Sequence, residues 1–329
     1  MKILLRILKL NHSSSSRTTF LSILKDTLHS MGHSVVEQFW RGRDPNPWIY
    51  LPQEERDMNA DFIIYEHKSR HQTVNGDLFF MEMYRDGMFT IDTEGWGPHH
   101  SAIQSRPDLS NIDIDCAKAF CASVCNDFLT NGRSKHPQPP LQSIDSPYKP
   151  YIFVPLQLQK DDTIIYDSPL QIIEFVDLVC EWALRSGRKV VFKLHPFCNE
   201  ETITSRLSQY AQKYQNIFLS SANIHNLIRE SDGILLINSG VGFESLIHGK
   251  PVVTFGDCDY KWLTFRAYPD DIDAADHYIR NYTAAQQNEG YQFVFFYHYQ
   301  HAINLHIEGN RLAARRIAKY LKTVLKDRS

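Results

Sequence analysis

The sequence has little charge imbalance and no long apolar run. Lys and Arg number 35 against 38 Asp and Glu, which gives a formal net charge of −3. A global positive field that would hold nucleic acid or an anionic membrane is therefore excluded. No stretch approaches the roughly 18–20 apolar residues that span a bilayer. Any anionic ligand must be bound by a local site.

Paired cysteines and a secretory signal are also missing. The six cysteines form no C-x-x-C pair. The opening MKILLRILKL is interrupted by Lys2, Arg6 and Lys9, whereas a signal peptide needs an unbroken apolar stretch and a small-residue cleavage site. We therefore predict reduced thiols in a cytoplasmic protein.

Glycine is scarce, at 15 of 329 residues, and unevenly placed. Five glycines fall between positions 233 and 256, which makes this segment the first to suspect of turning sharply beside a ligand. Prolines gather between 137 and 150, in a stretch that can be neither helix nor central strand. Since 329 residues suggest two domains, we predict an N-terminal domain (1–135), a linker (136–150), a second domain (151–308) and a C-terminal helix (309–329).

Short apolar strands alternate with helical patterns on both sides of this linker. Before it we expect strands at 2–8, 34–39, 61–66, 77–83 and 88–92, and helices near 17–31 and 114–129. After it we expect strands at 151–156, 190–194, 216–219, 233–237 and 251–255, and helices near 169–186, 200–214, 224–230 and 241–248. The alternation predicts an α/β fold with parallel sheets covered on both faces.

The strongest local motif is ILLINSGVGFESLIHGKPVVTF, residues 234–255. A buried strand ends at Asn238-Ser239, a turn containing Gly240 and Gly242 follows, and a helix opens. Backbone N–H groups at such a turn can approach a phosphate, and the helix dipole favours negative charge there. Glu244 could accept hydrogen bonds from a ribose diol. The alternative is that its negative charge simply interacts with the positive end of the helix dipole. The motif lacks the third glycine of the dinucleotide fingerprint, so we do not expect a redox enzyme.

Two further motifs follow predicted strands. KLHP places Lys193, His195 and Pro196 at the end of one strand, where a histidine can donate to a phosphate oxygen. LQLQKDDTI places Asp161 and Asp162 at the end of another, where a carboxylate can act as nucleophile or base. Ligands of open parallel sheets bind at these strand ends. The alternatives are a structural histidine and an ordinary polar turn.

We predict no metal site. Asp257-Cys-Asp259 resembles the D-x-D of many sugar transferases, but two other segments match that pattern equally well. Histidine pairs such as His99 and His100 lack an evident third ligand. The cysteines of the helix near 114–129 share one apolar face and are predicted to be core thiols: Cys116, Cys121 and Cys125.

Taken together, these motifs resemble the capsule polysaccharide biosynthesis family of bacterial retaining β-Kdo glycosyltransferases. The resemblance is clearest over 151–260, where PLQLQKDDTI, KLHP and NSGVGFESLIHGKPVVTFG occur in the family's order, and extends more weakly to MEMYRDGMFTIDTEGWGPHHS at 81–101. It implies a GT-B fold of two Rossmann-like domains with a cleft between them. It also implies CMP-Kdo as donor substrate, a saccharide or glycolipid acceptor, and neither a cofactor nor a metal.

The resemblance also assigns roles. His195-Pro196 and the Ser239–Glu244 turn would hold the CMP part of the donor, and one aspartate of Asp161-Asp162 would be the catalytic carboxylate. Three residues and the serine tract 13–16 lie in the domain that would face the acceptor sugar: Glu82, Arg85 and Asp92. The Kdo carboxylate needs a cation, for which the candidates are Lys160, Lys193 and Arg85.

The expected function is transfer of Kdo, or a related ulosonic acid, from its CMP donor to a saccharide with retention. The alternatives are an inverting transferase or epimerase that uses a UDP-sugar, and a non-catalytic saccharide-binding subunit. The helix near 310–326 is amphipathic and basic. We expect it to pack on a sheet with a solvated basic face; the alternative is peripheral contact with the inner membrane.

Overall fold

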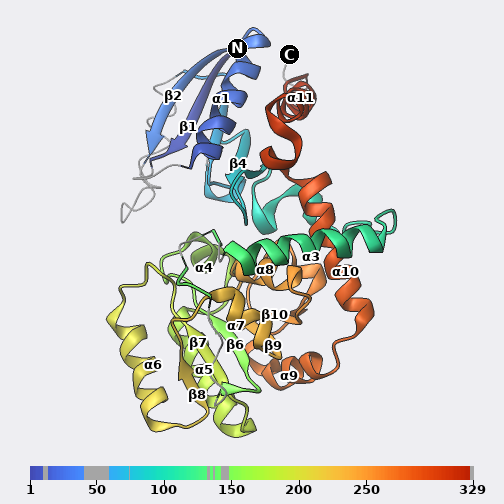
Figure 1. The fold of residues 1–329 in the computed structure, drawn as a ribbon. Coiled ribbons are helices and arrows are strands. Elements are labelled where there is room, and N and C mark those ends of the chain that lie inside the picture. The colour runs from blue at the N-terminus through green and yellow to red at the C-terminus, as the bar shows by residue number, and fades with distance from the viewer. Residues whose placement is uncertain are drawn as a thin grey trace. The chain divides into compact units, whose positions relative to one another are not determined.

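The computed structural model describes residues 1–9, 14–40, 59–73, 75–131, 134–135, 138–141 and 148–326 (Figure 1). They form two compact units. The first combines Met1–Pro107 with Tyr297–Ser329, and the second is Asp108–Phe296. Each unit contains a six-stranded sheet with helices packed against it. The predicted α/β class is confirmed.

The first unit has a mixed sheet in the order β12-β5-β4-β3-β1-β2. Strands β2, β1, β3 and β4 pair in parallel, whereas β5 runs antiparallel to both β4 and β12. The strands are β1 (Lys2–Leu8), β2 (Ser34–Trp40), β3 (Phe62–Glu66), β4 (Leu78–Glu82), β5 (Met88–Asp92) and β12 (Ile303–Asn304). Two helices, α1 (Ser15–Ser30) and α11 (Leu305–Lys326), bury their apolar faces in one core with this sheet.

The second unit has an all-parallel sheet in the order β11-β10-β9-β6-β7-β8. Its strands are β6 (Ile152–Pro155), β7 (Val190–Lys193), β8 (Ile217–Leu219), β9 (Gly233–Leu236), β10 (Val252–Thr254) and β11 (Phe265–Arg266). Its helices are α3 (Ile114–Asn131), α4 (Asp162–Asp167), α5 (Ile172–Ser186), α6 (Glu201–Lys213), α7 (Ile224–Glu230), α8 (Val241–Ile247), α9 (Ile272–Arg280) and α10 (Ala284–Phe296).

Helix α5 illustrates how the local sequence sets an element. Its N-terminus is closed by a capping box between Gln171 and Glu174, and it ends at Gly187 in the left-handed conformation with φ of 70°. Apolar residues recur three and four positions apart and are buried against β6 and β7: Ile172, Phe175, Val176, Val179 and Ala183. The helix therefore covers one face of the parallel sheet and orients the loop that precedes it.

The unit boundaries differ from the predicted domains. The chain enters the second unit at Asp108, not after residue 135, because α3 packs against α8 and α10. Gln292 of α10, for example, donates to the carbonyl of Ile112 at 2.7 Å. The described residues of the predicted linker lie within the second unit, where Asn223 Nδ2 donates to the carbonyl of Pro139 at 2.9 Å. Positions 136–137 and 142–147 of that linker lie outside the described residues.

The predicted C-terminal helix exists but belongs to the first unit. Strand β12 pairs with β5, and Gly309, with φ of 66°, breaks the helical backbone inside α11. Beyond this break, Ala313, Ile317 and Leu321 are fully buried in the core that also contains Phe20. The expectation that this helix packs on a sheet is therefore met, but on the N-terminal one.

Of the predicted core thiols, Cys121 is buried, Cys125 is half-buried and Cys116 is exposed. The prediction for Cys116 was wrong because this residue lies in the first turn of α3, where the helix is open to solvent. Among the described residues, no helix is both long enough and apolar enough to cross a bilayer.

Candidate active site

The order in which strands are added to the second sheet reverses between β6 and β9. Strands β7 and β8 lie on one side of β6, and the later strands β9, β10 and β11 lie on the other side. The carboxyl ends of β9, β6 and β7 are consequently neighbours, and the segments that follow them carry Asn238, Asp161 and His195. Such a topological switch point is where parallel sheets bind ligands. The three predicted motifs therefore begin at one edge of the sheet.

A pair of amide side chains joins the two strands at this point. Gln157, which follows β6, donates through Nε2 to Asn238 Oδ1 at 2.9 Å. The backbone N–H of Asn238 donates in return to Gln157 Oε1 at 3.3 Å. Gln157 and Asn238 are only 8% and 6% exposed. Buried amides must be satisfied by such partners. The pair therefore fixes the loop after β6 against the loop after β9.

The same network reaches Asp161. Its Oδ1 accepts hydrogen bonds from the amide (3.0 Å) and the hydroxyl (2.8 Å) of Thr163, which makes Asp161 the N-cap of α4. Thr163 in turn accepts from Gln157 at its hydroxyl (3.0 Å) and from Asn238 at its carbonyl (2.9 Å). Asp162 begins the helix, and both aspartates are half-buried. Asp161 is thus the aspartate that the amide pair orients.

His195 lies half-buried beyond the end of β7. Its Nδ1 accepts from the amide of Phe197 at 3.2 Å, so a neutral ring carries its proton on Nε2 and can donate there. Pro196 is exposed. Lys193 is 9% exposed and donates to the carbonyls of Ser221 (3.2 Å) and Ala222 (2.9 Å). Burial lowers the pKa of Lys193, and its contacts give it a structural role at the end of β8.

The glycine-rich turn is held mainly by its own groups. The amide of Val241 donates to Ser239 Oγ (3.3 Å) and that of Gly242 to the Ser239 carbonyl (2.9 Å). The buried Tyr260 hydroxyl donates to the same carbonyl. A Cβ on Gly242 would lie 2.6 Å from Tyr260 Cζ, so packing against this ring explains the glycine. Gly240 is exposed.

Glu244 lies in α8 and is 4% exposed. Its Oε1 accepts a hydrogen bond from the Ser134 hydroxyl at 2.6 Å. A buried carboxylate needs such donors, so Glu244 has a structural partner as well as its predicted role toward a ribose.

The predicted acceptor-side residues lie in the first unit. Glu82 accepts from the amide of Gly87 at 2.9 Å and is half-buried, as is Arg85. Asp92 is 1% exposed and accepts from the amide (3.0 Å) and hydroxyl (2.5 Å) of Ser101. Asp92 thus orders the segment after β5. Ser13 of the serine tract lies outside the described residues, and Ser14 caps α1.

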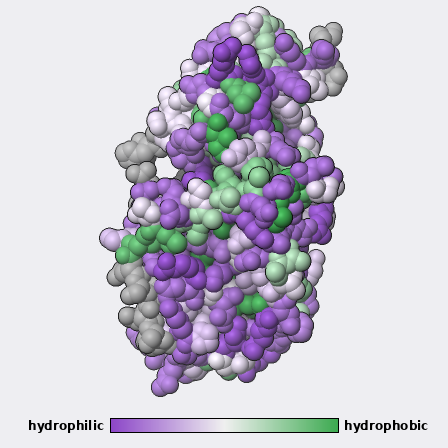
Figure 2. Space-filling view, turned by 45° about the vertical axis from the view of Figure 1, so that its right-hand side comes forward, coloured by the Kyte–Doolittle hydropathy of each residue, from purple (hydrophilic) through white to green (hydrophobic). Residues whose placement is uncertain are grey.

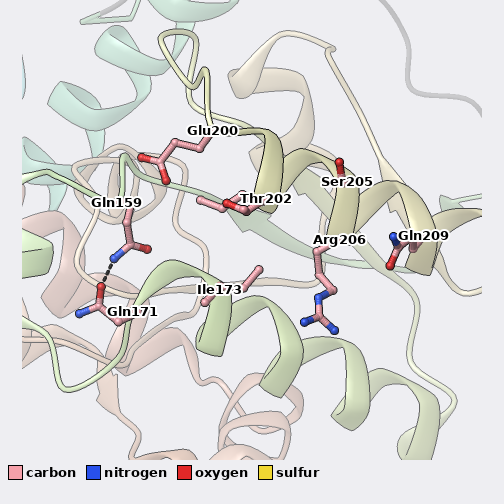
Figure 3. Close-up of a pocket in the computed structure, with 9 residues that line it drawn as sticks. Gln159, Gln171, Ile173, Glu200, Thr202, Ser205, Arg206 and Gln209 are labelled. Atoms are coloured by element: carbon pink, nitrogen blue, oxygen red, sulfur yellow. Dashed lines mark hydrogen bonds between the residues drawn. The ribbon is translucent and has the colours of Figure 1, made fainter.

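A groove of about 750 Å³ lies beside this site, between α5 and α6 (Figure 3). Gln159, from the loop after β6, donates to Gln171 at one end of the groove, as the dashed line marks. Glu200 and Arg206 extend from the loop before α6 and from that helix. None of the predicted site residues lines the groove. It is therefore a feature separate from the switch point.

Sequence reasoning missed three residues that organise the site: Gln157, Thr163 and Tyr260. Gln157 and Thr163 lie inside the LQLQKDDTI motif, but their role depends on β9 being the neighbour of β6. Tyr260 is distant in sequence from the turn that it supports, so no local pattern could reveal it.

Solved structures with the same fold include two from Thermosulfurimonas dismutans. KpsC described as a beta Kdo 2,7 transferase matches with a TM-score of 0.50 and 14% identity, over 97% of this chain and 99% of that one. KpsC described as a beta Kdo 2,4 transferase matches with a TM-score of 0.51 and 13% identity, over 95% and 97%. These similarities agree with the GT-B fold expected from the sequence.

Sequence comparison gives two further matches. Protein FixF of Sinorhizobium fredii (strain NBRC 101917 / NGR234) is 33% identical over 113 residues, which are 33% of this chain and 27% of FixF. This chain therefore spans only a minor part of that relative. Residues 138–314, more than half of the chain, match the family described as "Capsule polysaccharide biosynthesis protein". The chain belongs to this capsule polysaccharide biosynthesis family.

Proposed function

We propose that this protein transfers Kdo, or a related ulosonic acid, from a CMP-activated donor to a saccharide in capsule or surface polysaccharide synthesis. The observation that carries the proposal is the position of Asp161, an oriented and half-buried carboxylate at the switch point of the second sheet. Family membership and the beta Kdo transferase titles of two structures with the same fold support the choice of sugar.

The proposed reaction retains configuration through two displacements. In the first, Asp161 attacks the anomeric carbon, the bond from that carbon to the CMP phosphate oxygen breaks, and CMP leaves. In the second, an acceptor hydroxyl displaces the Asp161 carboxylate from the same carbon and its proton passes to solvent, which regenerates the free carboxylate. Each displacement inverts the configuration at the anomeric carbon, so the product has the configuration of the donor.

We choose Asp161 as the nucleophile because known contacts orient its carboxylate. Thr163 donates twice to Asp161 Oδ1, and Thr163 is itself held by the Gln157–Asn238 pair. A nucleophile fixed in this way does not lose conformational freedom as the reaction proceeds.

Other residues would bind the donor. His195 would donate from Nε2 to the phosphate and stabilise the leaving CMP, since its Nδ1 accepts from Phe197. Glu244 would accept from the ribose. Lys193 already donates to two carbonyls, so Lys160, exposed in the loop that carries Asp161, is the better-placed cation for the Kdo carboxylate. A single phosphate needs less charge neutralisation than a diphosphate, so we propose a reaction without a metal.

The test uses Asp161→Asn and Asp162→Asn as a matched pair with CMP-Kdo and a panel of saccharide acceptors. Asparagine is as good an N-cap as aspartate, so Asp161→Asn keeps the start of α4 while removing the nucleophile. We expect Asp161→Asn to lose turnover on the order of 10⁴-fold, with little change from Asp162→Asn. Intact-mass measurement should detect a Kdo ester on the wild type that Asp161→Asn lacks, and NMR should find retained configuration.

Three results would contradict the proposal. Normal turnover by Asp161→Asn would exclude it as the nucleophile. An inverted product, or thermal stabilisation by UDP and not by CMP, would favour an inverting transferase or an epimerase. No stabilisation by any nucleotide would favour a non-catalytic saccharide-binding subunit.

A further inference from the structure

The exposed face of α11 carries a stripe of positive charge. Between Gly309 and Lys326 the sequence has six Lys or Arg residues and no Asp or Glu, in a chain whose net charge is −3. Five of these cations are exposed, and at about 100° per residue they fall within about 80° of the helix circumference. We define them as the basic stripe: Arg311, Arg315, Lys319, Lys322 and Lys326.

The opposite face of α11 is not available to a ligand. Ala313, Ile317 and Leu321 are completely buried against the sheet, and Leu325 is 5% exposed. The helix therefore cannot insert an apolar face into lipid as an isolated amphipathic helix does. Any contact of α11 with a membrane surface must therefore be made by the basic stripe. Leu312, beside this stripe, is 47% exposed.

Three cations of the stripe have no acidic residue three or four positions away in the sequence, in contrast to Arg280 of α9. In α9, Arg280 lies 2.8 Å from Asp276, four residues earlier. In α11, Arg315, Lys319 and Lys322 instead have cations three or four residues away. Like charges at this spacing destabilise a helix by about 0.2–0.5 kcal/mol per pair. A surface that keeps such an arrangement suits an external anion.

We propose that the basic stripe docks the protein on an anionic lipid surface. The cations lie in a nearly straight line of about 22 Å, at 1.5 Å per residue, which suits a flat charged plane. Figure 2 turns this side forward and shows a mainly hydrophilic surface with hydrophobic residues in small spots. Each cation near such a membrane contributes about fivefold to binding, equivalent to about 1 kcal/mol. This inference goes beyond the proposed transfer reaction and does not depend on it.

The experiment measures co-flotation of the full chain, without nucleotide, with vesicles of phosphatidylcholine alone or with added phosphatidylglycerol. The variant Lys319→Gln/Lys322→Gln is compared with Lys118→Gln/Lys213→Gln, which changes two exposed helical lysines of the second unit. Both pairs remove two positive charges, so the comparison isolates position from net charge.

We expect binding to the phosphatidylglycerol vesicles alone, and a loss of about 25-fold in the α11 variant against less than about twofold in its control. Salt at about 1 M, where the Debye length is about 3 Å, should release the protein. The α11 variant should unfold at the same temperature as the wild type or slightly higher, since both lysines are exposed and their replacement removes like-charge pairs. Equal loss in both variants, equal binding to neutral vesicles, or binding of duplex RNA but not vesicles would overturn the proposal.

Discussion

Both sheets contain a switch point, but different kinds of side chain connect the two strands there. In the first unit the switch point lies between β1 and β3, and Glu66 at the end of β3 joins the two strands. Glu66 accepts from the amide of Leu8 at 2.8 Å and pairs with Arg17 of α1 at 2.5 Å, with both charged side chains less than a tenth exposed. The first switch point is therefore closed by a buried ion pair.

In the second unit, two neutral amides link the loop after β6 to the loop after β9. The half-buried Asp161 follows β6, and the half-buried His195 follows its neighbour β7. An ion pair satisfies its own charges and leaves little reason for a charged ligand to bind. An amide pair holds the loops in place without neutralising the acid and imidazole around it. The difference teaches that topology gives two equivalent positions, and that side-chain chemistry decides which one becomes a candidate active site.

The largest expected effect tests the buried ion pair. Arg17→Met leaves the Glu66 carboxylate buried without its arginine, which typically costs about 3–5 kcal/mol of stability. The control is Lys25→Met on the same helix, whose ion pair with Glu37 is about one-third exposed and should contribute less than about 1 kcal/mol. Urea unfolding measures both. Equal losses from the two variants would mean that burial of the Arg17 pair does not distinguish it.

A second prediction concerns His248, a buried histidine of the second unit away from its switch point, and the pH dependence of stability that it causes. His248 Nε2 lies 3.2 Å from His225 Nδ1, and His248 Nδ1 lies 3.2 Å from Cys125 Sγ. Burial first, and then the His225 charge, lower the pKa of His248 to about 3. Below pH 6.5 the unfolded chain therefore binds a proton that the folded protein refuses, and stability falls as the pH falls toward 3.

The loss of folding stability caused by His248 amounts to about 1.4 kcal/mol per pH unit at most, or about 3 kcal/mol between pH 7 and pH 4. His248→Gln should be less stable than the wild type at neutral pH but should lose less on acidification. His277→Gln, at an exposed position of α9, should follow the wild type. Parallel stability curves for His248→Gln and the wild type would show that His248 does not carry this pH dependence.

Much of the fold could be predicted because many strands, such as β3, β6 and β9, are short buried apolar runs. The helices of the second half are also clear where apolar residues keep helical spacing, as in α5. Helix α10 was missed because its apolar residues do not gather on one side, and β12 because it has only two residues. The domain boundary was misplaced because a cluster of prolines indicates an irregular chain and not where packing changes partners.

The candidate site could be predicted only in part. The motifs locate Asp161, His195 and Glu244 at strand or helix ends, since position along a strand can be predicted from sequence. Strand order cannot, so the contact between Gln157 and Asn238 appears only in three dimensions. In the first unit, the hydrogen bonds from Ser101 to both oxygens of Asp92 could not be predicted either, because they depend on the fold of the segment after β5.

A third prediction measures the amide pair directly. Gln157→Leu removes the donor to Asn238 Oδ1 and to the Thr163 hydroxyl, and the acceptor of the Asn238 backbone N–H. We expect a cost of about 2 kcal/mol, less than that of the Arg17 variant because no buried charge loses its partner. Asn238→Leu should cost a similar amount. The double variant should cost clearly less than the sum, because both changes remove the same interaction. Additive losses in urea unfolding would show that the two amides act independently.

The smallest effect concerns what glycine does near the site. Gly242→Ala would place a Cβ 2.6 Å from Tyr260 Cζ, and overpacking of this kind costs about 1–2 kcal/mol. Gly290, within α10, is a matched control because its nearest neighbour would be Leu246 Cδ2 at 3.6 Å. Gly290→Ala should therefore stabilise the protein by about 0.5–1 kcal/mol through helix propensity. If Gly242→Ala unfolds like the wild type but binds nucleotide more weakly, then ligand approach, and not packing against Tyr260, is the reason for glycine there.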